Sequence, residues 1–366
     1  MITTSALRSR DKDRFSVVWD TGRFCNYDCT YCEATRHNNF SKHKSLEEFL
    51  RSFAFIQQWT NLYNERRIVP ASTSINFTGG EPTANPNFWP LLDHIESQDE
   101  KYDLSLTTNG AWGPKFSKRI EETFNSVTIS YHAEAAQHLK DRAVENILRL
   151  HESSVNLQVN MMLHVDYWEE CTELYTMLKA KGITVNPRPI GDGNIVRKGW
   201  FIDSDGTNRR TSHEYNEEQQ AWFFNEVGVT AKPSCSAEGN QLGRKCCANI
   251  PMEGKVDGQW QPVKFINTEF KDWYCTVDWY FLYIDQETDK VYHHQTCKAL
   301  YDRQRGHLGD LTNPTAMLDA LKERLSQPEI KAIICPNPRC GCGMCAPKSQ
   351  NIDDFKQIQQ TFIKYE

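Results

Sequence analysis

Cysteine is the residue type whose spacing in this chain could do chemistry. The segment FCNYDCTYC, residues 24–32, brings Cys25, Cys29 and Cys32 within eight residues of one another. Three thiolates are one ligand short of a closed tetrahedral zinc site or a fully ligated iron–sulfur cluster. The spacing therefore predicts a metal site with one position open to water or substrate. Two alternatives stay open: a zinc knuckle completed by a distant ligand such as His37, and three unrelated thiols.

The other cysteines lie mostly in the second half of the chain. The sequence holds 13 in all, and only Cys171 falls within a segment of helical pattern, where we expect a small buried hydrophobic residue. The remaining nine stand in predicted loops or hairpins, at Cys235, Cys246, Cys247, Cys275, Cys297, Cys335, Cys340, Cys342 and Cys345. Clustered thiols in a reducing compartment usually serve metal or redox chemistry.

Composition indicates a folded protein of ordinary type. Of the 366 residues, 39% are hydrophobic and 25% are charged, and the net charge of −6 gives no global attraction to nucleic acid. The polar residues 1–14 and the absence of a long apolar run argue against a signal peptide and a membrane span. We therefore expect a cytoplasmic protein.

The elements that must position the cysteines alternate between strand and helix from Phe15 to about Pro189. This pattern is typical of a parallel sheet with crossover helices, either an open sheet or a partial barrel. Strands are predicted at Phe15–Trp19, Ser72–Thr78, Asp103–Thr107, Ser126–Ser130, Val155–Leu163 and Ile183–Arg188. Helices are predicted at Ser45–Tyr63, Asn87–Ser97, Lys115–Phe124, Ala135–His151 and Tyr167–Lys181. The first cysteine loop follows strand one, and Gly79-Gly80-Glu81-Pro82 follows strand two, at the edge where such sheets bind ligands.

Beyond residue 190 the sequence predicts short hairpins and loops around cysteines, with few helices before an amphipathic helix at Asp353–Tyr365. A hairpin is expected from Trp279–Asp285 and Lys290–Cys297. The predicted organisation is a tail (1–14), a core domain (15–190), a bridging segment (191–231), a cysteine-rich domain (232–350) and a C-terminal helix (351–366).

Together, the C-x3-C-x-aromatic-C loop and the Gly-Gly-Glu-Pro segment closely resemble the radical S-adenosylmethionine (radical SAM) superfamily. The resemblance implies a partial (β/α)6 TIM-type barrel. It implies that Cys25, Cys29 and Cys32 hold a 4Fe-4S cluster that binds SAM through its fourth iron. Residues implied to contact SAM are Tyr31 near the adenine, Gly79, Gly80, Glu81 and Pro82 near the ammonium group, and Thr108 and Asn109 in the Thr-Asn-Gly segment.

Other polar residues follow later strands. By the same resemblance, Ser130, Asn160 and Arg188 would contact the SAM ribose or carboxylate, although strand-end polar residues also serve as caps and loop anchors. His132 and Glu134 lie at the same edge and are candidates to face substrate or to anchor loops.

The C-terminal cysteines resemble the auxiliary-cluster extension called SPASM or twitch. The implied ligands of at least one auxiliary 4Fe-4S cluster are Cys275, Cys297, Cys335, Cys340, Cys342 and Cys345. The spacing differs from a full SPASM domain, which puts a second auxiliary cluster in doubt. Cys235, Cys246 and Cys247 could also ligate, and a structural zinc ribbon is the alternative.

The resemblance implies a cytoplasmic iron–sulfur oxidoreductase or maturase. It would cleave SAM reductively, and the resulting 5′-deoxyadenosyl radical would abstract a hydrogen atom from substrate. Flavodoxin or ferredoxin would be the reductant. Oxidation or crosslinking of a peptide or protein side chain is the first expectation. The roughly 14 residues before the first strand are too few for a separate N-terminal peptide-recognition domain, which weakens this expectation without removing it. A small metabolite or nucleotide is the alternative substrate, and a non-catalytic zinc protein is the remote alternative.

Overall fold

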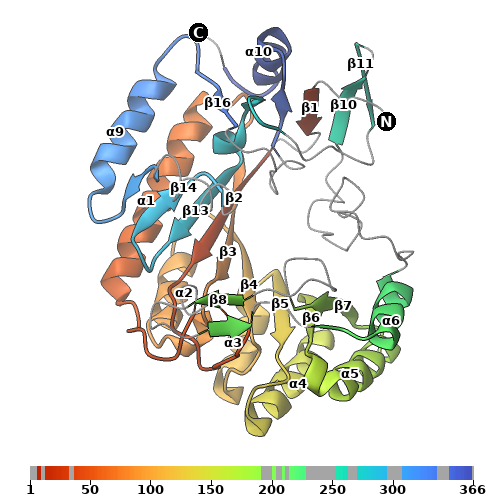
Figure 1. Ribbon diagram of the computed structural model, residues 1–366. Coiled ribbons are helices and arrows are strands. Elements are labelled where there is room, and N and C mark those ends of the chain that lie inside the picture. Colours follow the sequence, from red (N-terminus) through yellow and green to blue (C-terminus); the bar gives the residue numbers. More distant parts are fainter. Residues whose placement is uncertain are drawn as a thin grey trace. The chain divides into compact units, whose positions relative to one another are not determined.

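In the computed structural model the chain divides into two compact units. Figure 1 labels most of its helices and strands. Unit 1 comprises Met1–Trp19, Glu47–Ile75 and Arg244–Glu366, and unit 2 comprises Asp20–Leu46 and Asn76–Gly243. The residues that the structure describes are 6–9, 13–32, 37–190, 200–202, 208–210, 214–227, 252–256, 258–262, 270–294, 307–335 and 346–364. Among these residues, no helix is both long enough and apolar enough to cross a membrane.

Six parallel strands form the partial barrel that the family resemblance implied. They are β2 (Arg14–Asp20), β3 (Ser72–Thr78), β4 (Asp103–Thr108), β5 (Ser126–Tyr131), β6 (Asn156–Leu163) and β7 (Thr184–Pro189). Each predicted strand end lies within one residue of the observed end. Unit 2 contains the carboxyl ends of β2 and β3 together with β4 to β7. The cysteine loop and the Gly-Gly-Glu-Pro segment, which begin at these carboxyl ends, therefore belong to unit 2.

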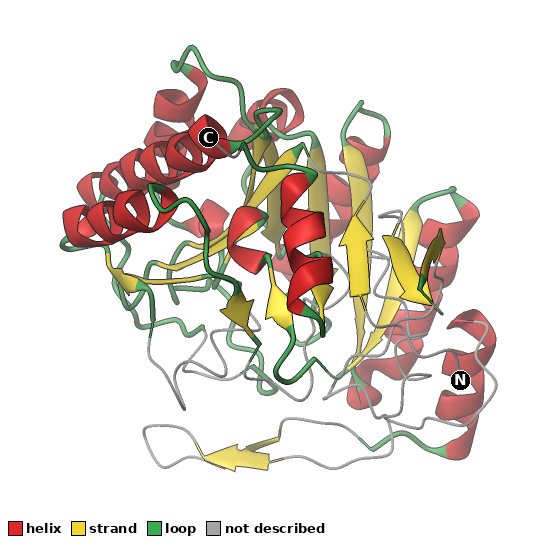
Figure 2. Cartoon of the chain, turned by 90° about the horizontal axis from the view of Figure 1, so that it is seen from above, coloured by secondary structure: helices red, strands yellow, loops and turns green. Residues whose placement is uncertain are grey.

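The helices between these strands also match the prediction to within three residues at each end. They are α1 (Leu46–Arg66), α2 (Phe88–Glu96), α3 (Ser117–Thr123), α4 (Gln137–His151) and α5 (Trp168–Ala180). In unit 2, α4 and α5 pack on β5, β6 and β7. The buried face of α4 is the apolar stripe Ala143, Ile147 and Leu150, which repeats at helical spacing. Figure 2 shows the strands in yellow beside the helices in red.

Unit 1 contains a sheet of six short strands that come from distant parts of the chain, in the order β11-β10-β1-β17-β12-β16. Their bounds are β1 (Ala6–Ser9), β10 (Met252–Val256), β11 (Gln259–Pro262), β12 (Tyr274–Cys275), β16 (Ile333–Ile334) and β17 (Lys348–Ser349). These strands pair antiparallel with their neighbours. Strands of two residues give almost no periodic signal, so the sequence did not predict this sheet.

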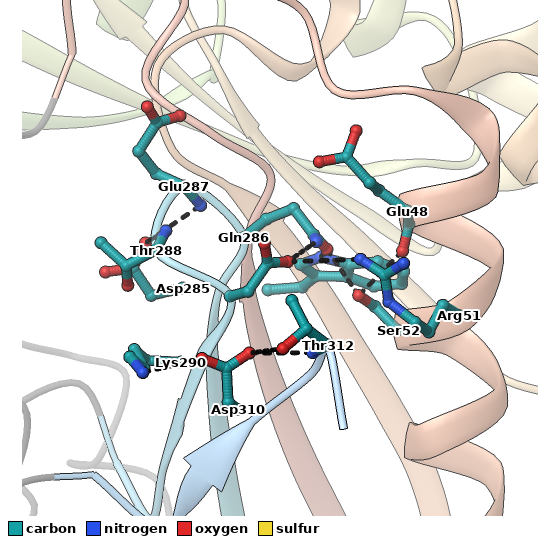
Figure 3. Close-up of polar contacts among 12 residues, drawn as sticks. Glu48, Arg51, Ser52, Asp285, Gln286, Glu287, Thr288, Lys290, Asp310 and Thr312 are labelled. Carbon is teal, nitrogen blue, oxygen red and sulfur yellow. Dashed lines mark hydrogen bonds and ion pairs between the residues drawn. The ribbon is translucent and has the colours of Figure 1, made fainter. Parts of the chain in front are cut away.

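The predicted hairpin is present in unit 1 as β13 (Phe281–Asp285) paired with β14 (Lys290–Tyr292), followed by β15 (Gly309–Asp310). Its turn is closed by Asp285, whose Oδ1 accepts hydrogen bonds from the amides of Glu287 and Thr288. The buried Gln286 fixes the turn to the unit: its Oε1 accepts from Trp19 Nε1 at 3.0 Å and from Ser52 Oγ at 2.7 Å (Figure 3). The turn therefore joins a strand and a helix that lie far away in the sequence.

The second half contains more helix than expected. Besides α10 (Ile352–Gln360), which ends five residues before the predicted Tyr365, it holds α6 (Glu217–Val227) and α9 (Pro314–Leu325). Pro314 occupies the first turn of α9, a position that favours proline. The buried residues of α9 follow helical spacing, at Met317, Leu318, Leu321 and Leu325. The expectation of few helices was wrong because the apolar pattern of α9 is short and lies between segments rich in cysteines and turn residues. Strands β8 (Trp200–Ile202) and β9 (Asn208–Arg210) pair antiparallel in unit 2.

Candidate functional site

The three predicted ligand cysteines come together in unit 2 on the loop that follows β2. Cys25 and Cys29 are buried and Cys32 is half-buried, and all three belong to one cluster with Tyr27, Tyr31, Ala111, Ala135 and Leu139. The loop is closed by backbone hydrogen bonds: the Cys25 amide donates to Asn38 O at 2.7 Å, and the Cys32 amide donates to Cys29 O at 3.1 Å. These bonds fold the backbone of the loop that places the three cysteines in this one cluster.

The thiols of this loop differ in their readiness to lose a proton. Burial raises the pKa of Cys25 to about 12, and the nearby Glu81 carboxylate adds to the shift. A hydrogen bond from Cys32 lowers the pKa of Cys29 to about 5, against the effect of burial. The same hydrogen bond and burial raise the pKa of Cys32 well above its ordinary range. A metal that binds all three as thiolates must therefore displace protons from Cys25 and Cys32.

The donor set fits an iron–sulfur cluster by its chemistry, because three thiols on one loop leave one metal position open. Within the described ranges, no three histidine, cysteine or acidic side chains already surround a single point as metal ligands. Cys29 and Cys32 are instead hydrogen-bonded to one another. The loop thus holds the ligands close together without forming a closed cage.

Gly79 and Gly80 let the end of β3 lie directly against the cysteine loop. Gly79 has φ +126°, in the region that favours glycine, and a Cβ there would lie 2.5 Å from Asp20 Oδ1. A Cβ on Gly80 would collide with the carbonyl of Phe24 and lie 2.5 Å from Arg23 O. The Glu81 amide donates to Phe24 O at 2.7 Å. Only glycine permits this close approach of the two backbones.

Glu81 is a buried carboxylate that ties the end of β3 to the end of β4. Its Oε1 accepts from Thr83 N (3.0 Å), Thr83 Oγ1 (2.6 Å) and Thr108 Oγ1 (2.7 Å), and its Oε2 accepts from Asn109 N (2.6 Å). Burial raises its pKa above the ordinary value, while these hydrogen bonds act in the opposite direction. Oε1 already accepts three hydrogen bonds, so a donor group of a ligand would form its hydrogen bond with Oε2.

Asn109 connects this carboxylate to the cysteine loop. Its Nδ2 donates to Asn26 Oδ1 at 2.7 Å and lies 4.0 Å from Cys25 Sγ. Its Oδ1 accepts from the Ala111 amide at 3.0 Å. The predicted SAM-contact residues Thr108 and Asn109 therefore brace Glu81 and the loop in this structure.

His132 and Tyr31, both predicted site residues, lie beside Cys29. Nδ1 of His132 is 2.6 Å from Tyr31 Oη and 3.6 Å from Cys29 Sγ, and the two rings are stacked at 14°. Burial lowers the pKa of His132, but the Cys29 thiolate outweighs it and leaves the pKa raised.

Glu134 contacts the loop between Cys29 and Cys32 through Thr30, and His164 Nε2 lies 3.2 Å from Glu134 Oε1. His164 Nδ1 accepts from the Asp166 amide at 3.2 Å, which places the imidazole proton on Nε2, toward the carboxylate. Burial raises the pKa of Glu134, but hydrogen bonds from His164 and Thr30 leave it below its ordinary value. Sequence reasoning missed His164, although it directly follows β6 at the same edge as the other candidates.

Ser130, Asn160 and Arg188 lie on neighbouring strands of the same sheet. Ser130 pairs with Asn160 in the β5–β6 register, and Arg188 Nε donates to Asn160 Oδ1 at 3.2 Å. The structure therefore brings these three predicted SAM-contact residues to adjoining positions on β5, β6 and β7.

Two predicted auxiliary ligands, Cys275 and Cys335, are described, and both are buried in unit 1. Strands β12 and β16 pair antiparallel, with Cys275 opposite Ile333, and the Cys335 amide donates to Trp273 O at 2.9 Å. If this register is continued by one residue, Trp273 lies opposite Cys335, and residues that lie opposite one another point to the same face of the sheet. Cys275 is two residues after Trp273 on the same strand, so Cys275 and Cys335 also lie on the same face of the sheet. Outside the described residues lie Cys235, Cys246, Cys247, Cys297, Cys340, Cys342 and Cys345. Cys171 is fully buried in α5.

Known proteins resemble this chain over parts of different length. A GTP 3′,8-cyclase of Clostridium perfringens (strain SM101 / Type A) is 24% identical over 243 residues, 58% of this chain and 72% of that protein. An S-adenosylmethionine-dependent nucleotide dehydratase of Selenomonas ruminantium is 30% identical over 87 residues, 24% of this chain and 27% of that protein. The solved structure of anSMEcpe with bound AdoMet has a TM-score of 0.49 and 17% identity, and covers 83% of this chain and 80% of that chain.

The family model described as the radical SAM superfamily matches residues 19–178. That segment holds the three-cysteine loop, the Gly-Gly-Glu-Pro segment and the network around Glu81 and Glu134. Over that segment, which spans 160 of the 366 residues, the chain is similar to the radical SAM superfamily.

Proposed function

We propose that the chain binds SAM beside an iron–sulfur cluster held by Cys25, Cys29 and Cys32 and removes a hydrogen atom from an organic substrate. The observation that supports this proposal is the close contact between the three-cysteine loop and the backbone of Gly79, Gly80 and Glu81. In this contact the Glu81 amide donates a hydrogen bond to Phe24 O. When bound, the cluster supplies the electron that cleaves SAM to methionine and a 5′-deoxyadenosyl radical.

The residues around the loop would bind and orient SAM. Oε2 of Glu81 accepts one hydrogen bond, from the Asn109 amide, and is the oxygen we expect to accept from the SAM ammonium group. Arg188 would attract the SAM carboxylate. Tyr31, held by His132, would lie against the adenine. Burial of Cys25, Cys29 and Glu81 limits access of water to the centre.

We propose a nucleotide or related small metabolite as the first substrate class, because the curated relatives named above are a GTP cyclase and a nucleotide dehydratase. Peptide or protein side chains, which the cysteine-rich extension predicts, are the second candidate. The shared face of Cys275 and Cys335 supports the auxiliary cluster on which that candidate depends. Flavodoxin or ferredoxin stays the proposed reductant.

Anaerobic reconstitution with iron and sulfide tests the catalytic proposal. One cluster requires about four irons per chain and two clusters about eight, and dithionite with SAM should yield 5′-deoxyadenosine. Alanine at Cys25, Cys29 or Cys32 should abolish this product, whereas Cys171→Ala, a buried thiol in α5, should retain it. Stoichiometric zinc without 5′-deoxyadenosine would show a structural zinc protein instead.

The auxiliary cluster is tested separately by counting iron. The triple alanine variant of Cys25, Cys29 and Cys32 should keep about half of the wild-type iron if Cys275 and Cys335 hold a second 4Fe-4S cluster. Cys275→Ala should lose the complementary half and still cleave SAM. Complete loss of iron in the triple variant would contradict the auxiliary cluster.

A further inference from the structure

One face of the sheet in unit 2 is mostly polar, and its apolar member on β6 is Met162, opposite Arg188. On β4, β5 and β6, alternate residues are apolar and buried, at Leu104, Leu106, Val127, Ile129, Val159, Met161 and Leu163. The residues between them carry hydroxyl or amide groups and are half-buried, at Ser105, Thr107, Ser126, Thr128, Ser130, Gln158 and Asn160. On β7, Asn186 and Arg188 continue this polar face.

The strand register arranges these polar residues in rows across the sheet. One row runs through Thr107, Thr128, Gln158 and Thr184, and the next runs through Ser130, Asn160 and Asn186. Two residues separate the rows along each strand, which corresponds to about 7 Å. The Gln158 row therefore lies two residues further from the carboxyl ends of the strands than Ser130 and Asn160, the residues predicted to contact SAM.

A polar face is unusual for a parallel sheet. Parallel strands that are covered on both faces are ordinarily apolar throughout, and barrel interiors are usually filled by branched apolar side chains. Burying hydroxyl and amide groups without partners would cost several kcal/mol each. Contacts such as Thr107 Oγ1 to Asn76 Oδ1 at 3.4 Å and Gln158 Nε2 to Asn160 Oδ1 at 3.4 Å satisfy part of this face. Solvent or a ligand that makes hydrogen bonds must satisfy the rest.

The chemistry of the rows indicates which ligand would fit. None of the side chains in the two rows is ionised, and the charge nearest to them on β7 is the cation Arg188. Amide side chains present a donor and an acceptor side by side, the arrangement that pairs with the edge of a nucleobase, while arginine suits phosphate. Asn160 Oδ1 already accepts from Gln158 Nε2 at 3.4 Å and from Arg188 Nε at 3.2 Å, which holds these side chains in place.

We infer that the Gln158 row is a substrate subsite that reads the base of a nucleotide, with Thr107 and Thr128 beside Gln158. This inference rests on the proposed function, because it takes Ser130, Asn160 and Arg188 as the SAM side of the same face. A peptide in extended conformation would use pockets for alternate side chains, whereas these rows offer a continuous hydrogen-bonding surface.

Equilibrium dialysis of the reconstituted full chain with SAM tests the subsite, using labelled GTP, ATP, CTP and UTP in turn. At least one nucleotide should bind, and Gln158→Leu should weaken its binding about tenfold, the effect of losing one or two hydrogen bonds. Thr128→Val should weaken it by a smaller factor. Gln58→Leu, at an exposed position of α1, is the matched control and should bind as wild type.

Binding of SAM to each variant is measured in parallel. Gln158→Leu also removes the hydrogen bond to Asn160 Oδ1, so SAM binding should weaken less than nucleotide binding, whereas a general loss of the fold would weaken both equally. Absence of binding by all four nucleotides, or equal binding by wild type and both row variants, would overturn the subsite. Failure of the proposed function has a different signature, namely no 5′-deoxyadenosine from SAM and dithionite whatever nucleotide is present.

Discussion

Glu134 holds Thr30 with both of its carboxylate oxygens. Oε2 accepts from the Thr30 amide at 2.9 Å, and Oε1 accepts from the Thr30 hydroxyl at 2.7 Å. Thr30 lies between Cys29 and Cys32, whereas Glu134 follows β5. The carboxylate thus connects the middle of the ligand loop to the edge of the sheet, and we propose a positioning role for Glu134, one of the two alternatives that the sequence left open.

Replacing this carboxylate should loosen the cysteine loop before any chemistry occurs. Hydrogen bonds to a charged group contribute about 1.5–3 kcal/mol each, so Glu134→Ala should increase amide hydrogen exchange in residues 25–32 of the metal-free chain and lower iron incorporation. Thr30→Ala should have a smaller effect, and Thr30→Ser should restore wild-type behaviour because it keeps the hydroxyl. Wild-type exchange and iron content in Glu134→Ala would contradict the positioning role.

The contact between Gly80 and the Phe24 carbonyl predicts a strong effect of a single methyl group. Because the added Cβ would collide with backbone, Gly80→Ala should destabilise the chain by roughly 1–3 kcal/mol and reduce cluster loading. Gly113→Ala is a matched control, since a Cβ at Gly113 would have nothing within 4 Å. Denaturant unfolding and iron content measure both effects, and equal behaviour of the two variants would show that the loop can move away.

The sequence predicted the parts of the fold that have a regular period. The strands around Val127 and Ile129 alternate apolar and polar residues, and α4 repeats its apolar residues at helical spacing, so their ends could be located closely. The sheet of unit 1 could not be predicted this way, because strands such as Tyr274–Cys275 are too short to show a period and pair with distant segments.

Site residues that belong to a sequence motif could be predicted. Residues that reach the site only through tertiary contacts could not. The roles of Thr30 and His164 depend on their contacts with Glu134. Thr30 and Glu134 are separated by 104 positions in the sequence. Similarly, Asn26 becomes relevant only through its hydrogen bond from Asn109. Strand-end position identified Glu134 itself, but its partners required the folded register.

The buried Asp278 of unit 1 should be important for stability. Its Oδ2 lies 2.6 Å from Arg324 Nη1 and accepts from Tyr63 Oη at 3.1 Å. Removing one member of a buried pair leaves an uncompensated charge, so Asp278→Asn should lower the free energy of unfolding by about 3–5 kcal/mol. Asp319→Asn, in the exposed Asp319–Lys322 pair of α9, should change it by under about 0.5 kcal/mol. Equal effects in denaturant unfolding would contradict this assignment.

Asp310 should make stability depend on pH in a defined direction. Burial raises its pKa, but hydrogen bonds from Lys290 and Thr312 outweigh burial and lower the pKa to about 2 (Figure 3). Because this value lies below the unfolded value of about 3.9, the carboxylate stabilises the fold above about pH 4. That stabilisation is lost as the pH falls from about 4 through 2. In urea unfolding of the metal-free chain, Asp310→Asn should therefore be less stable than wild type at pH 7, and the difference should shrink across this window. The exposed Asp319→Asn should follow wild type throughout, and a difference that does not depend on pH would show that Asp310 acts by packing alone.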